Sequence, residues 1–94
     1  MASRVMTEQM KRILRLRGNT EREIEQIGRA MWSRYTTYTY ISKNGKEKQI
    51  SRDDAIKKLG LEDYLAGMER SAFHESATIG LEDGGKVYFD TDFY

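Results

Sequence analysis

The sequence has 94 residues, which fits one domain over residues 1–94, because single domains cluster at about 100–150 residues. It has no cysteine and one histidine, which excludes a disulfide framework, a thiolate metal site and a histidine cluster for zinc. The formal charge is only +1, but residues 1–50 hold 11 Lys/Arg against 5 Asp/Glu, whereas residues 51–94 hold 5 against 10.

Two helices are expected at the N-terminal end. Apolar residues recur at helical spacing over residues 5–17, and Gly18 ends that segment. Thr20 followed by Glu23 matches a capping box, which begins a second helix. The spacing therefore predicts a helical hairpin. Its apolar positions are Met6, Met10, Ile13, Leu14, Ile24, Ile27, Met31 and Tyr35.

A β-hairpin is expected next. Residues 36–41 are all β-branched or aromatic, and the dipeptide Asn44-Gly45 is a strong signal for a two-residue turn. A type I′ turn at this dipeptide places Tyr40 opposite Gln49, because a tight turn fixes the register of the strands.

This register divides the hairpin into two faces. Tyr38 and Tyr40 lie on one face, and the other carries Thr37, Thr39, Ile41 and Ile50. We expect the threonine and isoleucine face to lie on the helices, so that the two tyrosines project outward as a binding surface. The alternative, in which the tyrosines form the core face, stays open because both faces carry strand-forming residues.

Two further helices follow the first hairpin. Ser51 with Asp54 repeats the capping pattern before a short helix over residues 52–59, and Gly60 fits its C-terminal cap. A second helical stripe of apolar residues then runs to about residue 74.

A second hairpin closes the sequence. Residues 78–81 and 86–93 flank the turn Glu82-Asp83-Gly84-Gly85, whose register the sequence leaves open. The order of elements predicts a small α+β domain. It has an N-terminal helical hairpin, two β-hairpins that form an antiparallel sheet, and two helices between the hairpins.

Few residues suit catalysis or metal binding. His74 is the only histidine, and its place near a helix C-terminus favours a structural role. A triad of His74 with Ser71 or Ser76 lacks any nucleophile-elbow pattern. Asp90 and Asp92 resemble a solvated, edge-protecting pair more than a cation site. We therefore expect a protein that is not an enzyme and has no cofactor and no metal.

Basic residues gather on the predicted helices and the first hairpin. A basic helix face beside a basic ribbon can follow a phosphate backbone, although nearby carboxylates also favour an ordinary solvated face. Direct nucleic-acid binding is thus the alternative function. Its candidate residues are Arg4, Lys11, Arg12, Arg15, Arg22 and Arg29.

Residues in the C-terminal half carry a family resemblance. They are the run Arg70-Ser71-Ala72-Phe73-His74 together with Ser51, Ala55 and Leu59-Gly60. In these residues the sequence resembles small accessory proteins of bacterial phages and mobile elements. The resemblance implies a protein that works by binding a host or rival protein, as inhibitors of restriction and CRISPR systems do.

We therefore expect a non-enzymatic protein that occupies a surface of a macromolecular partner. The sequence has no apolar run of about 18 residues and no secretory signal pattern, which predicts a cytoplasmic protein without a membrane partner. The oppositely charged halves leave a homo-oligomer open. The candidate partner-binding residues are Tyr38, Tyr40, Lys43, Lys46 and Lys48.

Overall fold

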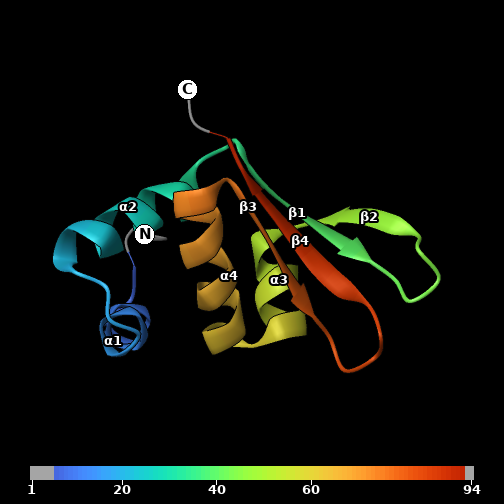
Figure 1. Cartoon of the computed structure of the whole chain (residues 1–94), viewed down its shortest axis with the longest axis horizontal. Helices are drawn as coiled ribbons and strands as arrows, with labels where there is room; N and C mark the ends of the chain where they lie inside the picture. Colours follow the sequence, from blue (N-terminus) through green and yellow to red (C-terminus); the bar gives the residue numbers. More distant parts are fainter. Residues whose placement is uncertain (1–5, 93–94) are drawn as a thin grey trace.

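The computed structural model describes residues 6–92. The chain forms a four-stranded antiparallel sheet in the order β2-β1-β4-β3, and the helices lie on one side of it (Figure 1). The predicted α+β class is confirmed, including the order of its elements. These are α1 (Glu8–Leu16), α2 (Glu21–Trp32), β1 (Thr36–Ile41), β2 (Glu47–Ile50), α3 (Arg52–Leu59), α4 (Leu61–His74), β3 (Ser76–Gly80) and β4 (Lys86–Thr91).

The helix ends follow local capping chemistry. The Thr20 hydroxyl accepts the backbone N–H of Glu23, whose carboxylate accepts the N–H of Thr20, so the predicted capping box is confirmed. Thr7 caps α1 and Ser51 caps α3 in the same way, each through its hydroxyl. Gly60 separates α3 from α4 with a φ of +83°, a conformation that only glycine adopts without strain.

Helix α4 lies at the centre of the molecule. It packs against β3 and β4 on one side and contacts α1, α2 and α3 on its other sides (Figure 1). Its residues Tyr64, Leu65 and Met68 are fully buried. The core therefore sits where α4 meets the helix-facing side of the sheet. In the described chain, no helix is long and apolar enough to cross a membrane.

The predicted turn of the first hairpin is wrong. The N–H of Ser42 donates to the carbonyl of Lys46, and the N–H of Gly45 donates to the carbonyl of Ser42, both at 2.8 Å. These bonds close a three-residue loop in which Gly45, but not Asn44, has a positive φ. A type I turn followed by a left-handed glycine also uses an Asn-Gly pair, so this dipeptide does not by itself select the loop length.

The different loop changes the register of the strands. Tyr40 lies opposite Lys48 rather than Gln49, and Tyr38 lies opposite Ile50. Ile50 therefore lies on the same face of the hairpin as Tyr38 and Tyr40, not on the face of the threonines. This makes the tyrosine face the more apolar of the two. The expectation that the two tyrosines project away from the helices is wrong. Tyr38 is only 4% exposed and lies in the core, and Tyr40, on the same side of the sheet, is half-buried and packs against the core.

The second hairpin has the same loop geometry. The N–H of Leu81 donates to the carbonyl of Gly85, and Gly84 has a φ of +90°. This places Ile79 opposite Val87, with both side chains on the helix side of the sheet. The register that the sequence left open is therefore that of a three-residue loop.

Candidate functional site

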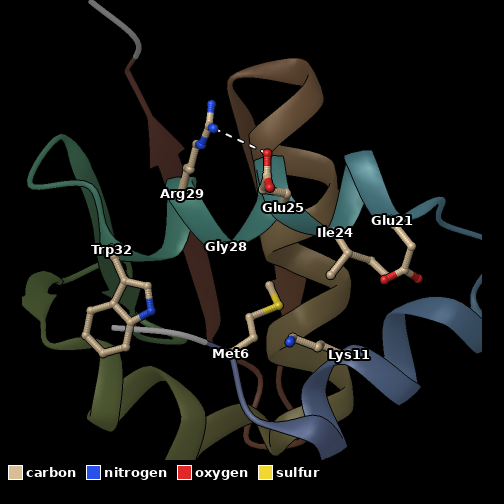
Figure 2. Close-up of a pocket in the computed structure, with 8 residues that line it drawn as sticks. All are labelled: Met6, Lys11, Glu21, Ile24, Glu25, Gly28, Arg29 and Trp32. Carbon is tan, nitrogen blue, oxygen red and sulfur yellow. Dashed lines mark hydrogen bonds and ion pairs between the residues drawn. The ribbon is translucent and has the colours of Figure 1, made fainter. Parts of the chain in front are cut away.

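A cleft of about 620 Å³ lies between α1 and α2 (Figure 2). Its apolar wall comes from Met6, which precedes α1, and from Ile24, Gly28 and Trp32, which lie one helical turn apart along α2. Charged side chains of both signs border it. They are Lys11, Glu21, Glu25 and Arg29.

Trp32 connects the end of this cleft to α3. The guanidinium carbon of Arg52 lies 3.6 Å from the centre of the Trp32 ring, within the range of a cation–π contact. The indole Nε1 is buried and has no hydrogen-bond partner among the described residues. The sequence shows the tryptophan, but the pairing with Arg52 depends on how α2 and α3 meet.

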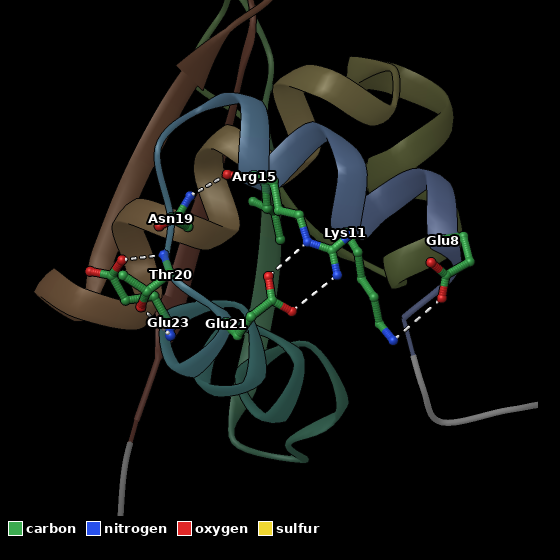
Figure 3. A network of polar contacts seen from close by, with 8 residues as sticks. Glu8, Lys11, Arg15, Asn19, Thr20, Glu21 and Glu23 are labelled. Carbon is green, nitrogen blue, oxygen red and sulfur yellow. Dashed lines mark hydrogen bonds and ion pairs between the residues drawn. The ribbon is translucent and has the colours of Figure 1, made fainter.

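Three of the predicted nucleic-acid-binding residues are paired within the N-terminal helices, and Figure 3 shows two of them, Lys11 and Arg15. Arg15 donates to both carboxylate oxygens of Glu21, at 2.7 and 3.0 Å. This hydrogen bonding lowers the pKa of Glu21 and raises that of Arg15. The ammonium of Lys11 lies 3.5 Å from a carboxylate oxygen of Glu8. These pairs neutralise part of the basic helix surface.

The other candidates on these helices differ from one another. Arg29 lies 3.2 Å from Glu25, one helical turn away. Arg12 and Arg22 are exposed and have no carboxylate within ion-pair distance among residues 6–92. Arg4 lies outside the described residues. The predicted arginine and lysine stripe is therefore only partly free to meet a phosphate backbone.

A polar cluster that the sequence did not indicate fixes the α1–α2 loop to α4. Arg17 donates to both carboxylate oxygens of Glu69, at 2.9 and 3.3 Å, and the Asn19 side chain donates to the same group at 2.6 Å. Partial burial pushes the pKa of Glu69 upward, but the hydrogen bonds from Arg17 and Asn19 outweigh it and hold this pKa below its ordinary value. The partners are 50 residues or more apart, so no local spacing points to them.

Basic residues also gather where the first hairpin meets α3. A shallow hollow of about 430 Å³ lies between β1, β2 and α3, with Tyr40 and Ile50 among its lining residues. Four charged residues complete it: Lys48, Asp54, Lys57 and Lys58. We name this the hairpin–α3 surface and include in it the two lysines of the nearby hairpin loop, Lys43 and Lys46.

The lysines of the hairpin–α3 surface form no close ion pair, although Lys58 interacts electrostatically with Asp83. In the part of the chain that the structure describes, none has a carboxylate oxygen within ion-pair distance. Lys58 instead lies over the ring of Tyr40, 4.2 Å from its centre. Two predicted partner-binding groups, Tyr40 and Lys48, are thus brought together here with Lys57 and Lys58, which the sequence analysis did not select.

Tyr40 is held in place by the second hairpin. Its hydroxyl donates to the Asp83 carboxylate at 3.1 Å, which raises the pKa of Tyr40. The backbone N–H of Gly85 donates to the same carboxylate at 2.7 Å. The hydrogen bonds from Gly85 and Tyr40 hold the pKa of Asp83 below its ordinary value. The ring is therefore fixed beside the lysines rather than free to rotate.

The residues considered for catalysis differ in their exposure to solvent. Ser71 is fully buried and shares a hydrogen bond with the Thr91 hydroxyl, which joins α4 to β4. His74 is exposed at the last turn of α4. Within residues 6–92, no group of three or more histidine or acidic residues is arranged to hold a metal ion.

The sequence matches no protein-family model, and no curated protein or solved structure is significantly similar to it. Its function must therefore be inferred from its own surfaces.

Proposed function

We propose that this is a non-enzymatic binding protein whose hairpin–α3 surface occupies an acidic patch on a macromolecular partner. The observation that supports the proposal most is the set of unpaired lysines around the fixed ring of Tyr40. Aromatic side chains give large contact area at low entropic cost, and unpaired cations attract a negatively charged surface.

The distribution of charge favours a protein partner over nucleic acid. Asp54 lies in the hollow with the lysines, and Asp53 is exposed next to it in α3. A phosphate backbone is uniformly negative, so it meets repulsion at each of these carboxylates, whereas a protein surface carries both signs. The resemblance to phage and mobile-element accessory proteins adds a class of partner, namely a nucleic-acid-handling host or defence enzyme.

Two charge-reversal variants test the proposal. Lys48→Glu with Lys57→Glu changes the hairpin–α3 surface, and Arg12→Glu with Arg22→Glu makes the same change in net charge on the helices. The parent protein and both variants are used to capture a partner from the source cell, and the purified partner is then titrated with each. We expect the first variant to bind at least about tenfold more weakly at low salt, and the control to bind as the parent does.

Equal affinity of the parent and the Lys48/Lys57 variant for the partner would contradict the proposal. Binding of labelled single- or double-stranded DNA or RNA, lost in the Arg12/Arg22 variant and steeply weakened by salt, would instead support the nucleic-acid alternative. Circular dichroism of each variant verifies that the fold is intact.

A further inference from the structure

One edge of the sheet lacks the usual protection against pairing. β3 is an edge strand, and its five residues include no charged residue and no proline. The opposite edge, β2, carries Glu47 and Lys48. Natural proteins commonly place charges, prolines or bulges on edge strands, because free backbone groups there pair with other chains. β3 is therefore the edge that remains open to another strand.

The hydrogen bonds at the two ends of β3 establish which backbone groups are free. The N–H of Leu81 donates to the carbonyl of Gly85, and the N–H of Thr91 donates to the carbonyl of Glu75. Bonded and non-bonded pairs alternate along an antiparallel ladder, so the odd-numbered residues of β3 bond to β4. The even-numbered residues direct their N–H and C=O groups away from the sheet. They are Ser76, Thr78 and Gly80.

A polar hollow of about 380 Å³ adjoins the Gly80 end of this edge. Asp63, Glu82 and Asp83 line it with a single cation, Lys58. Gly80 is exposed and is itself one of the residues that line the hollow. A side chain of an additional strand that pairs with β3 at Gly80 would therefore lie next to the hollow, and the net negative charge of the hollow favours a lysine or arginine there.

We propose that β3 binds an extended segment of a partner protein, which adds a fifth strand to the sheet and places a basic side chain over the acidic hollow. Backbone pairing of this kind supplies affinity, while the pocket beside the strand supplies specificity. β3 and β2 are the two opposite edges of the sheet, so this proposal goes beyond the function proposed for the hairpin–α3 surface, although Lys58 lines both hollows. A second copy of the chain fits less well. Antiparallel pairing with Thr78 opposite Thr78 places residues 74–76 of one copy beside the hollow of the other, and these residues include Glu75 but no lysine or arginine.

Titration with a synthetic peptide tests the proposal on the full chain. The probe is an eight-residue peptide of alternating threonine and valine with one central lysine. One control peptide has glutamate in place of lysine, and another has N-methyl groups on alternate backbone nitrogens. We expect the lysine peptide to shift the NMR signals of Thr78 and Gly80 and to slow their amide exchange at least about tenfold. Both control peptides should bind at least about tenfold more weakly.

Protein variants locate the binding site. Thr78→Pro removes an outward N–H without removing a bond to β4, and Glu82→Gln reduces the charge of the hollow. Each should weaken binding, and Glu82→Gln tests the charge even if the proline variant folds poorly. The Lys48→Glu/Lys57→Glu variant should bind the peptide as the parent does, which separates this proposal from the proposed function.

Three results would overturn the inference. The first is the absence of any shift with the lysine peptide at several millimolar. The second is a set of shifts centred on Lys48 and Lys57 instead of β3. The third is sedimentation that increases with protein concentration and is reversed by Thr78→Pro, because the occupant of the edge would then be a second copy.

Discussion

The hydroxyl groups of Tyr38 and Tyr64 lie 2.8 Å apart in the core and join β1 to α4. The Tyr38 ring also meets Phe89 edge to face, with ring centres 5.5 Å apart. Tyr38 has a further acceptor within reach, the sulfur of Met68 at 3.6 Å. Two strands and the central helix therefore meet around one polar contact in an otherwise apolar layer.

Removing one of these hydroxyls should lower the free energy of unfolding more than removing both. Tyr38→Phe leaves the buried Tyr64 hydroxyl without its partner, so we expect the free energy of unfolding to fall by about 1–3 kcal/mol. Tyr64→Phe should cost less, because Tyr38 keeps Met68 as an acceptor. Urea denaturation of both single variants and the double variant checks this. Losses that simply add in the double variant would show that the two hydroxyls are not coupled.

The same pair should make the protein sensitive to alkali. Burial raises the pKa of Tyr38 and of Tyr64 above the ordinary value of about 10. Above pH 10 the unfolded chain loses these protons while the folded chain keeps them, so stability that is present below pH 10 is lost as the pH rises. A buried tyrosine lowers the free energy of unfolding by up to about 1.4 kcal/mol per pH unit between its pKa in the unfolded chain and its raised pKa in the folded chain.

Chemical denaturation between pH 8 and about 11.5 measures this slope. The double variant Tyr38→Phe/Tyr64→Phe is the control, because it retains every other titrating group. It should lose stability less steeply than the parent above pH 10. Parallel curves for the two proteins would argue against the buried tyrosines as the cause.

Two glycines in helices should respond to alanine in opposite directions. A Cβ atom at Gly67 would lie 2.4 Å from a ring carbon of Phe89, whereas one at Gly28 would lie 3.6 Å from Met6. We expect Gly67→Ala to destabilise the protein by about 1–3 kcal/mol or more through steric overlap. Gly28→Ala should stabilise it by about 0.5–1 kcal/mol, since alanine is the better helix former. Thermal unfolding in which both variants behave alike would count against the close packing of α4 on β4.

Acid should weaken the contact between the α1–α2 loop and α4. The pKa of Glu69 is depressed in the folded protein, so its contribution is present above the unfolded value of about 4.5 and is lost as the pH falls through the folded value. We expect Glu69→Gln to lower the free energy of unfolding at pH 7 by about 1 kcal/mol or less, because Arg17 is partly exposed. The difference from the parent should disappear near pH 2, and a constant difference at all pH values would exclude the ion pair as its source.

Local chemistry accounts for most of what the sequence predicts correctly. The capping box of Thr20 and Glu23 and the left-handed Gly60 act within a few residues, so α2 and the break between α3 and α4 can be predicted without knowledge of the fold. Even where the end of a strand is misplaced, as for residues 78–81 against β3, the element itself is predicted correctly.

The incorrect predictions have one physical origin in the first hairpin. Asn44-Gly45 suits a two-residue and a three-residue loop, and the difference of one residue moves Ile50 to the side of Tyr38. The hairpin–α3 surface was therefore only partly predictable, since Lys57 and Lys58 reach Tyr40 through the packing of α3 on β1. Such contacts depend on tertiary structure and leave no periodic pattern in the sequence.

The central place of β4 affects how the protein is made. β1 can pair with β2 as soon as the first hairpin leaves the ribosome, but its other edge pairs only with β4. While α3, α4 and β3 are being synthesised, one edge of β1 in the nascent chain therefore stays unpaired beside the apolar face that carries Tyr38. Such an edge is prone to aggregation and is a natural target for chaperones. The time needed to synthesise residues 86–91, rather than the time needed to form any helix, should thus determine how long the edge of β1 stays unpaired.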